Sequence, residues 1–379
     1  MTPSAKLRKI RHLDPVLTLA TLGLLALGTV MVFSSSSSIG AEKFGDSAYY
    51  LKRHLIWMAI GGLGMGVTFF INPFPLKKLA TPALIGGLIL LGLVMVTGTA
   101  RNKAVRWLNL GGLVFQPSEF VKLTVVLYTA AYLAKARERI QKFSKGLLPL
   151  LATVGGIVLV LLKEPDFGTA VLVTFVVAMM VFVGGANLWH VGALGALAGV
   201  ASYALILSSA YRRRRLMAFL HPWQDPLGSG FQILQSFIAF QNGGFQGQGL
   251  GDGTQKLLYL PEMHTDFIFA VIAEELGFLG SFLVIFLFAL IVIQGFRLSL
   301  RLREPFTSSL ALGLTGLIGF QAFFHMAVVM GLVPTKGLTL PFISYGGSSL
   351  VITLMSIGLL LSLSATLSMT TSMARRRVR

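Results

Sequence analysis

The chain has 379 residues, of which 54% are hydrophobic and 12% are charged, and its mean hydropathy is +0.77. A soluble globular protein carries about 25% charged residues, so this composition excludes that class and indicates a membrane protein. The net charge is +18 without a long basic stretch, so no nucleic acid partner is expected. Cysteine is absent, the histidines lack a metal-binding spacing, and no Gly-Lys dipeptide exists to form a P-loop.

Ten apolar runs follow one another along the chain, each close to the roughly 20 residues that a membrane-spanning helix needs. We therefore expect an all-α polytopic membrane protein of about ten transmembrane helices, forming a single domain over residues 1–379. The first run follows a basic segment, but it is too long for a signal sequence, and we interpret it as a retained span. The runs lie at 15–35, 54–71, 79–98, 116–134, 147–162, 168–185, 190–210, 266–296, 307–332 and 345–367.

Basic residues gather in alternate connections between these spans. If the N-terminus is cytoplasmic, the alternation places most of them on the cytoplasmic side, as the positive-inside rule requires. The even number of spans then puts both termini in the cytoplasm. These cationic connections also contact anionic lipid. They contain Lys77, Lys78, Lys135, Arg137, Arg139, Lys142, Lys145, Arg297, Arg301 and Arg303.

The opposite face is predicted to carry basic residues as well, against the rule. Positive charge there is tolerated most readily where it holds an anion such as phosphate, because arginine offers phosphate oxygens a bidentate fork. We interpret Arg101 and Arg106, near Trp107 in the loop 97–116, in this way. For the arginine run 212–215, a solvated loop edge is an equally good interpretation. The same face includes Lys103, Lys256 and Lys336.

One large extracytoplasmic loop, at about 211–265, separates the seventh and eighth spans. Its six glycines between 243 and 253 resemble a phosphate-binding loop, but no strand precedes them, so we do not expect a nucleotide site. We expect a flexible loop that packs over a membrane-facing groove, with the apolar residues 258–261 at the membrane interface. This arrangement suits a lipid-linked ligand.

Ionisable residues occur at or inside several spans, where each costs about 2.5–3.5 kcal/mol on insertion scales and usually lines a cavity or pathway. Asp266 stands at the mouth of the eighth span, and the alternative is that Thr265 or Asp266 only caps a helix. Glu119 and Lys122 are three residues apart, so a helix-locking ion pair is the alternative to a functional role. The prolines and glycines of 334–349 predict irregular backbone, which is allowed at such depth where it lines a cavity.

These motifs resemble the SEDS family (shape, elongation, division and sporulation), whose members polymerise the glycan strands of bacterial peptidoglycan. The segments 259–262 and 341–349 resemble the division members more than the elongation members. Because several long motifs occur in the family's order across most of the chain, the resemblance is specific. The matching segments are 106–111, 116–119 with Lys122, 164–169, 259–262, 264–269, 274–277 and 341–349.

The resemblance implies ten spans in the bacterial cytoplasmic (inner) membrane and a lipid II polymerase for septal cell-wall synthesis, with its active site facing outward. It implies that Asp266 is the catalytic residue. We expect Asp266 to act as general base on the attacking sugar hydroxyl, with direct inversion as undecaprenyl pyrophosphate leaves. The candidate substrate-binding residues are Trp107, Arg101, Arg106, Glu119, Lys122, Lys336, Ser344 and Ser348, and Lys103 joins the possible cations for the pyrophosphate.

The expected partners are lipid II, the growing glycan strand, a class B penicillin-binding protein, other divisome proteins and membrane lipid. No cofactor is certain and no protein metal site is expected, although a divalent cation, Mg²⁺ or Mn²⁺, could share the charge of the pyrophosphate. Two alternatives stay open: a lipid II flippase or transporter, and a polymerase for cell elongation. A channel or ordinary secondary transporter is a third, for which we find no inverted repeat of broken helices.

Overall fold

A computed structural model describes residues 9–101, 104–111, 113–253 and 263–377. Within that part of the chain, ten helices match the ten apolar runs in order. Six of them are long and apolar enough to cross a membrane: α2, α4, α6 with the turn before it, α11, α12 and α13. The ten helices are α2 (Pro15–Phe44), α3 (Tyr49–Phe70), α4 (Leu76–Thr97), α5 (Pro117–Lys135), α6 (Leu148–Lys163), α7 (Phe167–Val183), α8 (Leu188–Leu207), α11 (Ile268–Arg301), α12 (Pro305–Val329) and α13 (Gly347–Arg377).

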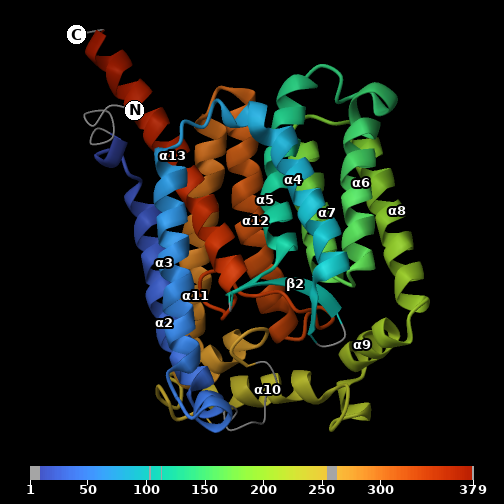
Figure 1. Ribbon diagram of the computed structural model, residues 1–379, viewed down its shortest axis with the longest axis vertical. Helices are drawn as coiled ribbons and strands as arrows, with labels where there is room; N and C mark the ends of the chain where they lie inside the picture. The colour runs from blue at the N-terminus through green and yellow to red at the C-terminus, as the bar shows by residue number, and fades with distance from the viewer. Residues whose placement is uncertain (1–8, 102–103, 112, 254–262, 378–379) are drawn as a thin grey trace.

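The ten helices run side by side as one bundle (Figure 1). The start of α2 and the end of α13 lie at one end of it. Strand β2 and the helices α9 and α10 lie at the opposite end, which we call the distal end. Helix α12 is buried over most of its length, whereas none of the described side chains of α8 is buried. The bundle therefore has inner helices that hold the core and outer helices that expose apolar side chains.

Short polar side chains begin several of the helices. Asp14 accepts hydrogen bonds from the backbone amides of Val16 and Leu17, at 3.0 and 3.1 Å. In the same way Asn187 caps α8 and Glu304 caps α12. Such caps satisfy backbone amides that have no partner inside the helix, so the helix starts are encoded locally.

The first helix is longer than predicted, because α2 continues to Phe44 rather than ending near residue 35. The serines that follow the apolar run lower its hydropathy but do not break the helix. Ser36 Oγ, for example, donates to the carbonyl of Val32 at 2.6 Å. The helix ends where Gly45 adopts a left-handed conformation, with φ of 66°.

The connection between α4 and α5 is a small antiparallel sheet rather than a plain loop. Its strands are β1 (Thr99–Arg101), β2 (Ala104–Leu110) and β3 (Leu113–Phe115), in the order β1-β2-β3. Thr99 pairs with Trp107, and Asn109 pairs with Val114. The sequence analysis did not predict these strands, because strands this short give too weak a periodicity to recognise.

The large connection between α8 and α11 contains more helix than the expected flexible loop. It includes α9 (Ala210–Leu220), a turn of 3-10 helix (Pro222–Gln224) and α10 (Phe231–Gly243), and α10 packs against α11. The predicted interfacial segment 258–261 lies outside the described residues. The glycines from 243 onward follow α10 and lead into the most irregular part of the bundle.

Helix α11 is broken at Gly277, where φ is 65° and ψ is −158°. The glycine-rich segment 244–249 fills this break with backbone hydrogen bonds. The amides of Gln248 and Gly249 donate to the carbonyls of Glu274 and Glu275, each at 3.0 Å. Such pairing satisfies backbone groups that the break leaves without a partner in the helix.

The two backbones at this break approach too closely for side chains. A Cβ on Gly247 would collide with the backbone of Glu275 and Gly277, and a Cβ on Gly277 would collide with Gly247. Beside the break, the buried carboxylate of Glu275 accepts a hydrogen bond of 2.6 Å from Ser34 Oγ of α2. The glycines thus fix the first half of α11, which follows directly after Asp266.

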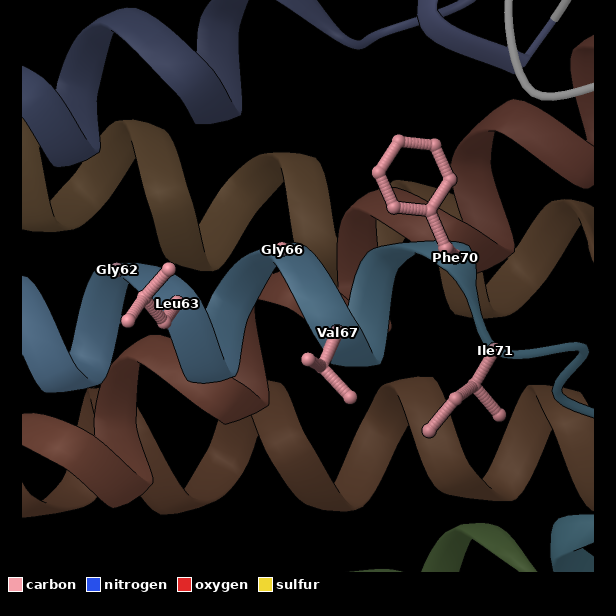
Figure 2. Close-up of a pocket in the computed structure, with 6 residues that line it drawn as sticks. All are labelled: Gly62, Leu63, Gly66, Val67, Phe70 and Ile71. Carbon is pink, nitrogen blue, oxygen red and sulfur yellow. The ribbon is translucent and has the colours of Figure 1, made fainter. Parts of the chain in front are cut away.

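An apolar groove runs along α3 toward its C-terminal end (Figure 2). It is open because Gly62 and Gly66 carry no side chain and nothing else lies where a Cβ would be. It is lined by Gly62, Leu63, Gly66, Val67, Phe70 and Ile71.

Candidate functional site

Four connections meet at the distal end of the bundle and form the candidate site. They are the β-sheet before α5, the turn between α6 and α7, the segment before α11, and the connection between α12 and α13. Hydrogen bonds or ring contacts join each of them to at least one other, as the following paragraphs describe. The site is thus assembled from residues that are far apart in sequence.

Asp266 lies at the centre of these segments. Helix α11 begins at Ile268, and its N-cap residue is Phe267, which makes no side-chain capping bond. Asp266 thus lies one residue before the N-cap position of α11. Asp266 is partly buried, and a Cβ placed on Gly337 would lie 3.1 Å from its Oδ2 atom. The carboxylate thus lies against the α12–α13 connection, beside the residue that follows Lys336.

Ser344 fixes the backbone next to Asp266. Its hydroxyl donates to the carbonyl of Thr265 at 2.6 Å and accepts from the amide of Leu340 at 2.8 Å. The amide of Tyr345 donates to the carbonyl of His264 at 2.9 Å. Ser344, which we predicted to bind substrate, therefore connects the α12–α13 connection to the segment that carries Asp266.

Ser348 makes an equivalent connection to the sheet. Its hydroxyl accepts from the amide of Gln116 at 2.9 Å and donates to the carbonyl of Val114 at 3.3 Å. These contacts join the first turn of α13 to the end of β3 and the start of α5. Both predicted serines are thus in the site region, where the structure shows their hydroxyls bound to backbone.

Arg106 lies between β2 and the α6–α7 turn. Its Nε atom donates to the carbonyl of Glu164 at 2.9 Å, and an Nη atom donates to the carbonyl of Pro165. Asp166, in the same turn, caps α7 through Thr169 and accepts from Ser118 Oγ at 3.0 Å. The guanidinium group is therefore held by neutral carbonyls, which leave its positive charge available to an anion.

Glu164 has an unusual environment in this turn. Burial has the largest effect and, together with the negative charge of Asp166, raises its pKa to about 7. The positive charge of Arg106 lowers the pKa by a smaller amount. Its Oε1 atom is buried, and no hydrogen-bond partner for it occurs in the part of the chain that the structure describes. The charge of Glu164 therefore changes near physiological pH.

Three further cations lie near the start of α7 or on the α12–α13 connection. Lys336 Nζ lies 4.7 Å from the centre of the Phe167 ring, and the Arg212 guanidinium lies 5.9 Å from it. Arg215 Nη1 donates to the carbonyl of Thr335 at 3.2 Å. Burial lowers the pKa of Lys336 to about 8. Helix α9 thus brings two arginines of the 212–215 run to this region.

Glu119 and Lys122 are paired with each other. Lys122 Nζ lies 2.7 Å from Glu119 Oε2 and donates to Gln321 Oε1 of α12 at 2.8 Å. The Lys122 side chain is 2% exposed. This geometry matches the ion-pair alternative, because both charges are used in the interface between α5 and α12.

Two residues of α12 that we did not predict shape the irregular backbone after it. Gln321 Nε2 donates to the carbonyl of Thr339 at 3.0 Å, and His325 Nδ1 donates to the carbonyl of Leu338 at 2.7 Å. They are four residues apart, so they share one face of the helix. Two polar side chains at this spacing in an apolar helix are the sequence signal that could have identified them as a polar contact surface.

The other predicted residues differ in how far the structure describes them. Trp107 is partly exposed in β2, opposite Thr99. The side chain of Arg101 and all of Lys103 lie outside the described part of the chain. No group of three His, Asp or Glu side chains suitable for a metal ion occurs among the described residues.

The sequence matches a family model described as "Cell cycle protein", for FtsW, RodA and SpoVE, over residues 15–369. The chain belongs to the FtsW/RodA/SpoVE family. A relative from Geobacter sulfurreducens, "Probable peptidoglycan glycosyltransferase FtsW", is 43% identical over 369 residues, which cover 97% of this chain and 99% of the relative. "Stage V sporulation protein E" of Bacillus subtilis is 39% identical over 93% of this chain and 96% of its own length.

Solved structures support the same family. A chain from "Structural coordination of polymerization and crosslinking by a peptidoglycan synthase complex" is 33% identical, with a TM-score of 0.76, over 94% of this chain and 98% of its own length. The "Rod shape determining protein RodA" of Thermus thermophilus is 30% identical, with a TM-score of 0.68, over 93% and 96%. The predicted resemblance is confirmed, including its FtsW-like character, and the chain is a multi-pass, mainly α-helical membrane protein.

Proposed function

We propose that this chain is a peptidoglycan glycosyltransferase that polymerises glycan strands from lipid II during septal cell-wall synthesis, with Asp266 as general base. The names of its FtsW relatives support the reaction class and the septal role. The observation that carries the mechanism is the position of Asp266 against the connection that contains Lys336. An acid that accepts a proton and a cation that binds an anion thus occupy neighbouring positions.

The reaction joins two lipid-linked sugars. The 4-hydroxyl of the acceptor attacks the anomeric carbon of the donor, and its proton passes to the Asp266 carboxylate. As the new glycosidic bond forms, the bond to undecaprenyl pyrophosphate breaks and its electron pair leaves with the pyrophosphate. Inversion from the α-linked donor to the β-linked product needs one base and no covalent intermediate. A positioned general base contributes about 10² to 10⁴ in rate.

The leaving pyrophosphate needs positive charge around it. The described residues that support this role are Arg106, Lys336 and Arg212 at the α6–α7 turn and the start of α7, and Arg215, which bonds to the carbonyl of Thr335. Lys122 contributes to the packing of α5 against α12, because its ammonium group is paired with Glu119 and donates to Gln321. A divalent cation stays a prediction, and Mg²⁺ or Mn²⁺ would bind chiefly through substrate oxygens.

The orientation in the membrane is part of the proposal. Ten spans with both termini in the cytoplasm would place the distal end outside, where the substrate is polymerised. The distribution of lysine and arginine supports it, since 18 of the 32 fall on the predicted cytoplasmic side when both termini are included. The helices that meet the length and hydropathy of a span support a bundle that crosses the membrane several times.

A crosslinking partner follows from the same family. The similar chain comes from a complex that coordinates polymerisation and crosslinking. We infer that this chain acts with a class B penicillin-binding protein, which crosslinks the new strands, and with other divisome proteins. Membrane lipid surrounds the exposed apolar side chains of the outer helices.

The test is gel analysis of glycan strands formed from lipid II by the full chain with its penicillin-binding partner. The comparison includes wild type, Asp266→Asn and the control Asp252→Asn, an exposed acid of the same distal end. We expect strands from wild type and the control, and none from Asp266→Asn. Strands from Asp266→Asn would overturn the general base. Movement of labelled lipid II across vesicles without strands from any variant would favour the flippase alternative.

A further inference from the structure

The arginines of α9 point in two directions. At about 100° per residue, the first and fourth residues of a run share one face of a helix and the two between them share another. Arg212 and Arg215 are partly buried and contact Phe167 and the carbonyl of Thr335. Arg213 and Arg214 are exposed on the other side. The site at the α6–α7 turn therefore uses only half of this run.

The outward arginines line a groove of their own. Its walls are formed by Ala210, Arg213, Arg214, Met217 and Ser229. Among the described residues, neither guanidinium group forms a salt bridge within 4.0 Å.

One acid lies near the groove. Asp225 accepts from the amide and the hydroxyl of Ser229, at 2.7 and 3.0 Å. The hydrogen bond from the Ser229 amide in particular, and the charge of Arg214 to a smaller extent, lower the pKa of Asp225. This single carboxylate leaves the groove with net positive charge, because two guanidinium groups line it.

Large apolar side chains are exposed on α9, where Met217 lines the groove, and in the segment that follows α9. Met217 and Leu220 of α9 are 51% and 54% exposed, Trp223 is 74% exposed and Leu227 is 90% exposed. Helix α9 starts three residues after the end of α8, which buries none of its described side chains. The groove therefore lies on a helix that directly follows the exposed helix α8, at the distal end of the bundle (Figure 1). Arginine and tryptophan at such a boundary are typical of a membrane interface.

We propose that the groove between Arg213, Arg214 and Ser229 binds the phosphate of an anionic phospholipid from the surrounding bilayer. The two guanidinium groups match a phosphate oxygen pair, and the apolar rim accepts the upper part of the acyl chains. A free phosphate ion would gain nothing from that rim. The lipid-linked substrate has its own cations on the opposite face of the same helix. This proposal rests on the membrane location and not on the glycosyltransferase reaction.

The test is native mass spectrometry of the full chain, purified in detergent and titrated with phosphatidylglycerol. Each arginine near an anionic lipid contributes roughly fivefold to binding, so Arg213→Gln with Arg214→Gln should weaken the tightest site by roughly 20- to 30-fold. The lysine double variant keeps the charge but not the bidentate fork, and should lose only part of the affinity. The control is Arg137→Gln with Arg139→Gln, which removes two exposed arginines from the α5–α6 connection and should leave the tightest site unchanged.

Three competitors identify the ligand. Phosphatidylcholine should bind the wild type much more weakly than phosphatidylglycerol, and neither inorganic phosphate nor lipid II should displace bound phosphatidylglycerol. Equal binding by wild type and the glutamine double variant, when both have the same melting temperature without lipid, would overturn the site. Displacement by inorganic phosphate or by lipid II would also overturn it, because the groove would then hold a free anion or the substrate.

Discussion

The hydroxyl of Ser344 donates a 2.6 Å hydrogen bond to the backbone carbonyl of Thr265, the residue directly before Asp266. The proposed base is thereby tied to a connection that begins some 70 residues later in the chain. Because Lys336 belongs to the same connection, any movement of this segment changes the position of base and cation together.

Ser344→Ala removes this tie. We expect kcat to fall by about tenfold with little change in KM, because the variant still binds substrate but no longer holds Asp266 in place. The amide and carbonyl left without partners should lower the free energy of unfolding by about 1–3 kcal/mol. Strand synthesis with varied lipid II and thermal melting measure the two effects. Ser348→Ala, which loses two comparable hydrogen bonds away from Asp266, should affect melting more than kcat.

Gly337→Ala tests the contact between the α12–α13 connection and Asp266. The new Cβ would lie 3.1 Å from Asp266 Oδ2, so the carboxylate must shift by a few tenths of an ångström. We expect kcat to fall by about 10- to 100-fold, while melting changes little because Gly337 is exposed. Gly192→Ala in α8, where the Cβ meets nothing, is the matched control. Wild-type rates in Gly337→Ala would show that the carboxylate is not confined here.

Lys336 should make substrate binding depend on pH. Its pKa of about 8 means that it is charged below pH 8 and neutral above it. KM for lipid II should therefore rise as the pH increases through 8, and Lys336→Arg should remove that rise, since arginine stays charged. Initial rates from pH 6.5 to 9.5 give the profile. The same pH profile in wild type and Lys336→Arg would mean that another group titrates.

Glu164 should change stability at lower pH. Its folded pKa of about 7 lies above its usual value, so between about pH 4.5 and 7 the folded state binds more protons than the unfolded state. The free energy of unfolding should therefore fall as the pH rises through that window. Glu164→Gln keeps the neutral form and should remove this contribution. Melting temperatures at pH 5 and pH 8 compare the two proteins, with the exposed Glu42→Gln as control.

The break in α11 should not tolerate side chains. Gly277→Ala requires a φ of 65°, and its Cβ would collide with the backbone of Gly247. Strain of about 1–3 kcal/mol is typical for such a conformation, and the collision adds to it. We expect a lower melting temperature and little strand synthesis for Gly277→Ala and Gly247→Ala. Gly195→Ala, in open space on α8, should keep both properties.

The sequence by itself determined the bundle. Hydropathy located ten helices, and most of their boundaries agree within a few residues because an apolar helix is a property of consecutive side chains. The spacing of Glu119 and Lys122 offered an ion pair as the alternative to substrate binding, since residues three apart share a helix face, and the structure contains that pair. The family motifs identified the chain's relatives and pointed to Asp266.

Only the tertiary structure decided how the site is assembled. Nothing local to Arg106 reveals that it bonds to the α6–α7 turn, or that Lys336 and Arg212 approach the same phenylalanine ring. The two faces of α9 became visible only once the run 212–215 was known to be helical and its neighbours were placed. These relationships depend on which helices pack together, and contacts between residues distant in sequence are set by that packing rather than by any periodicity in the chain.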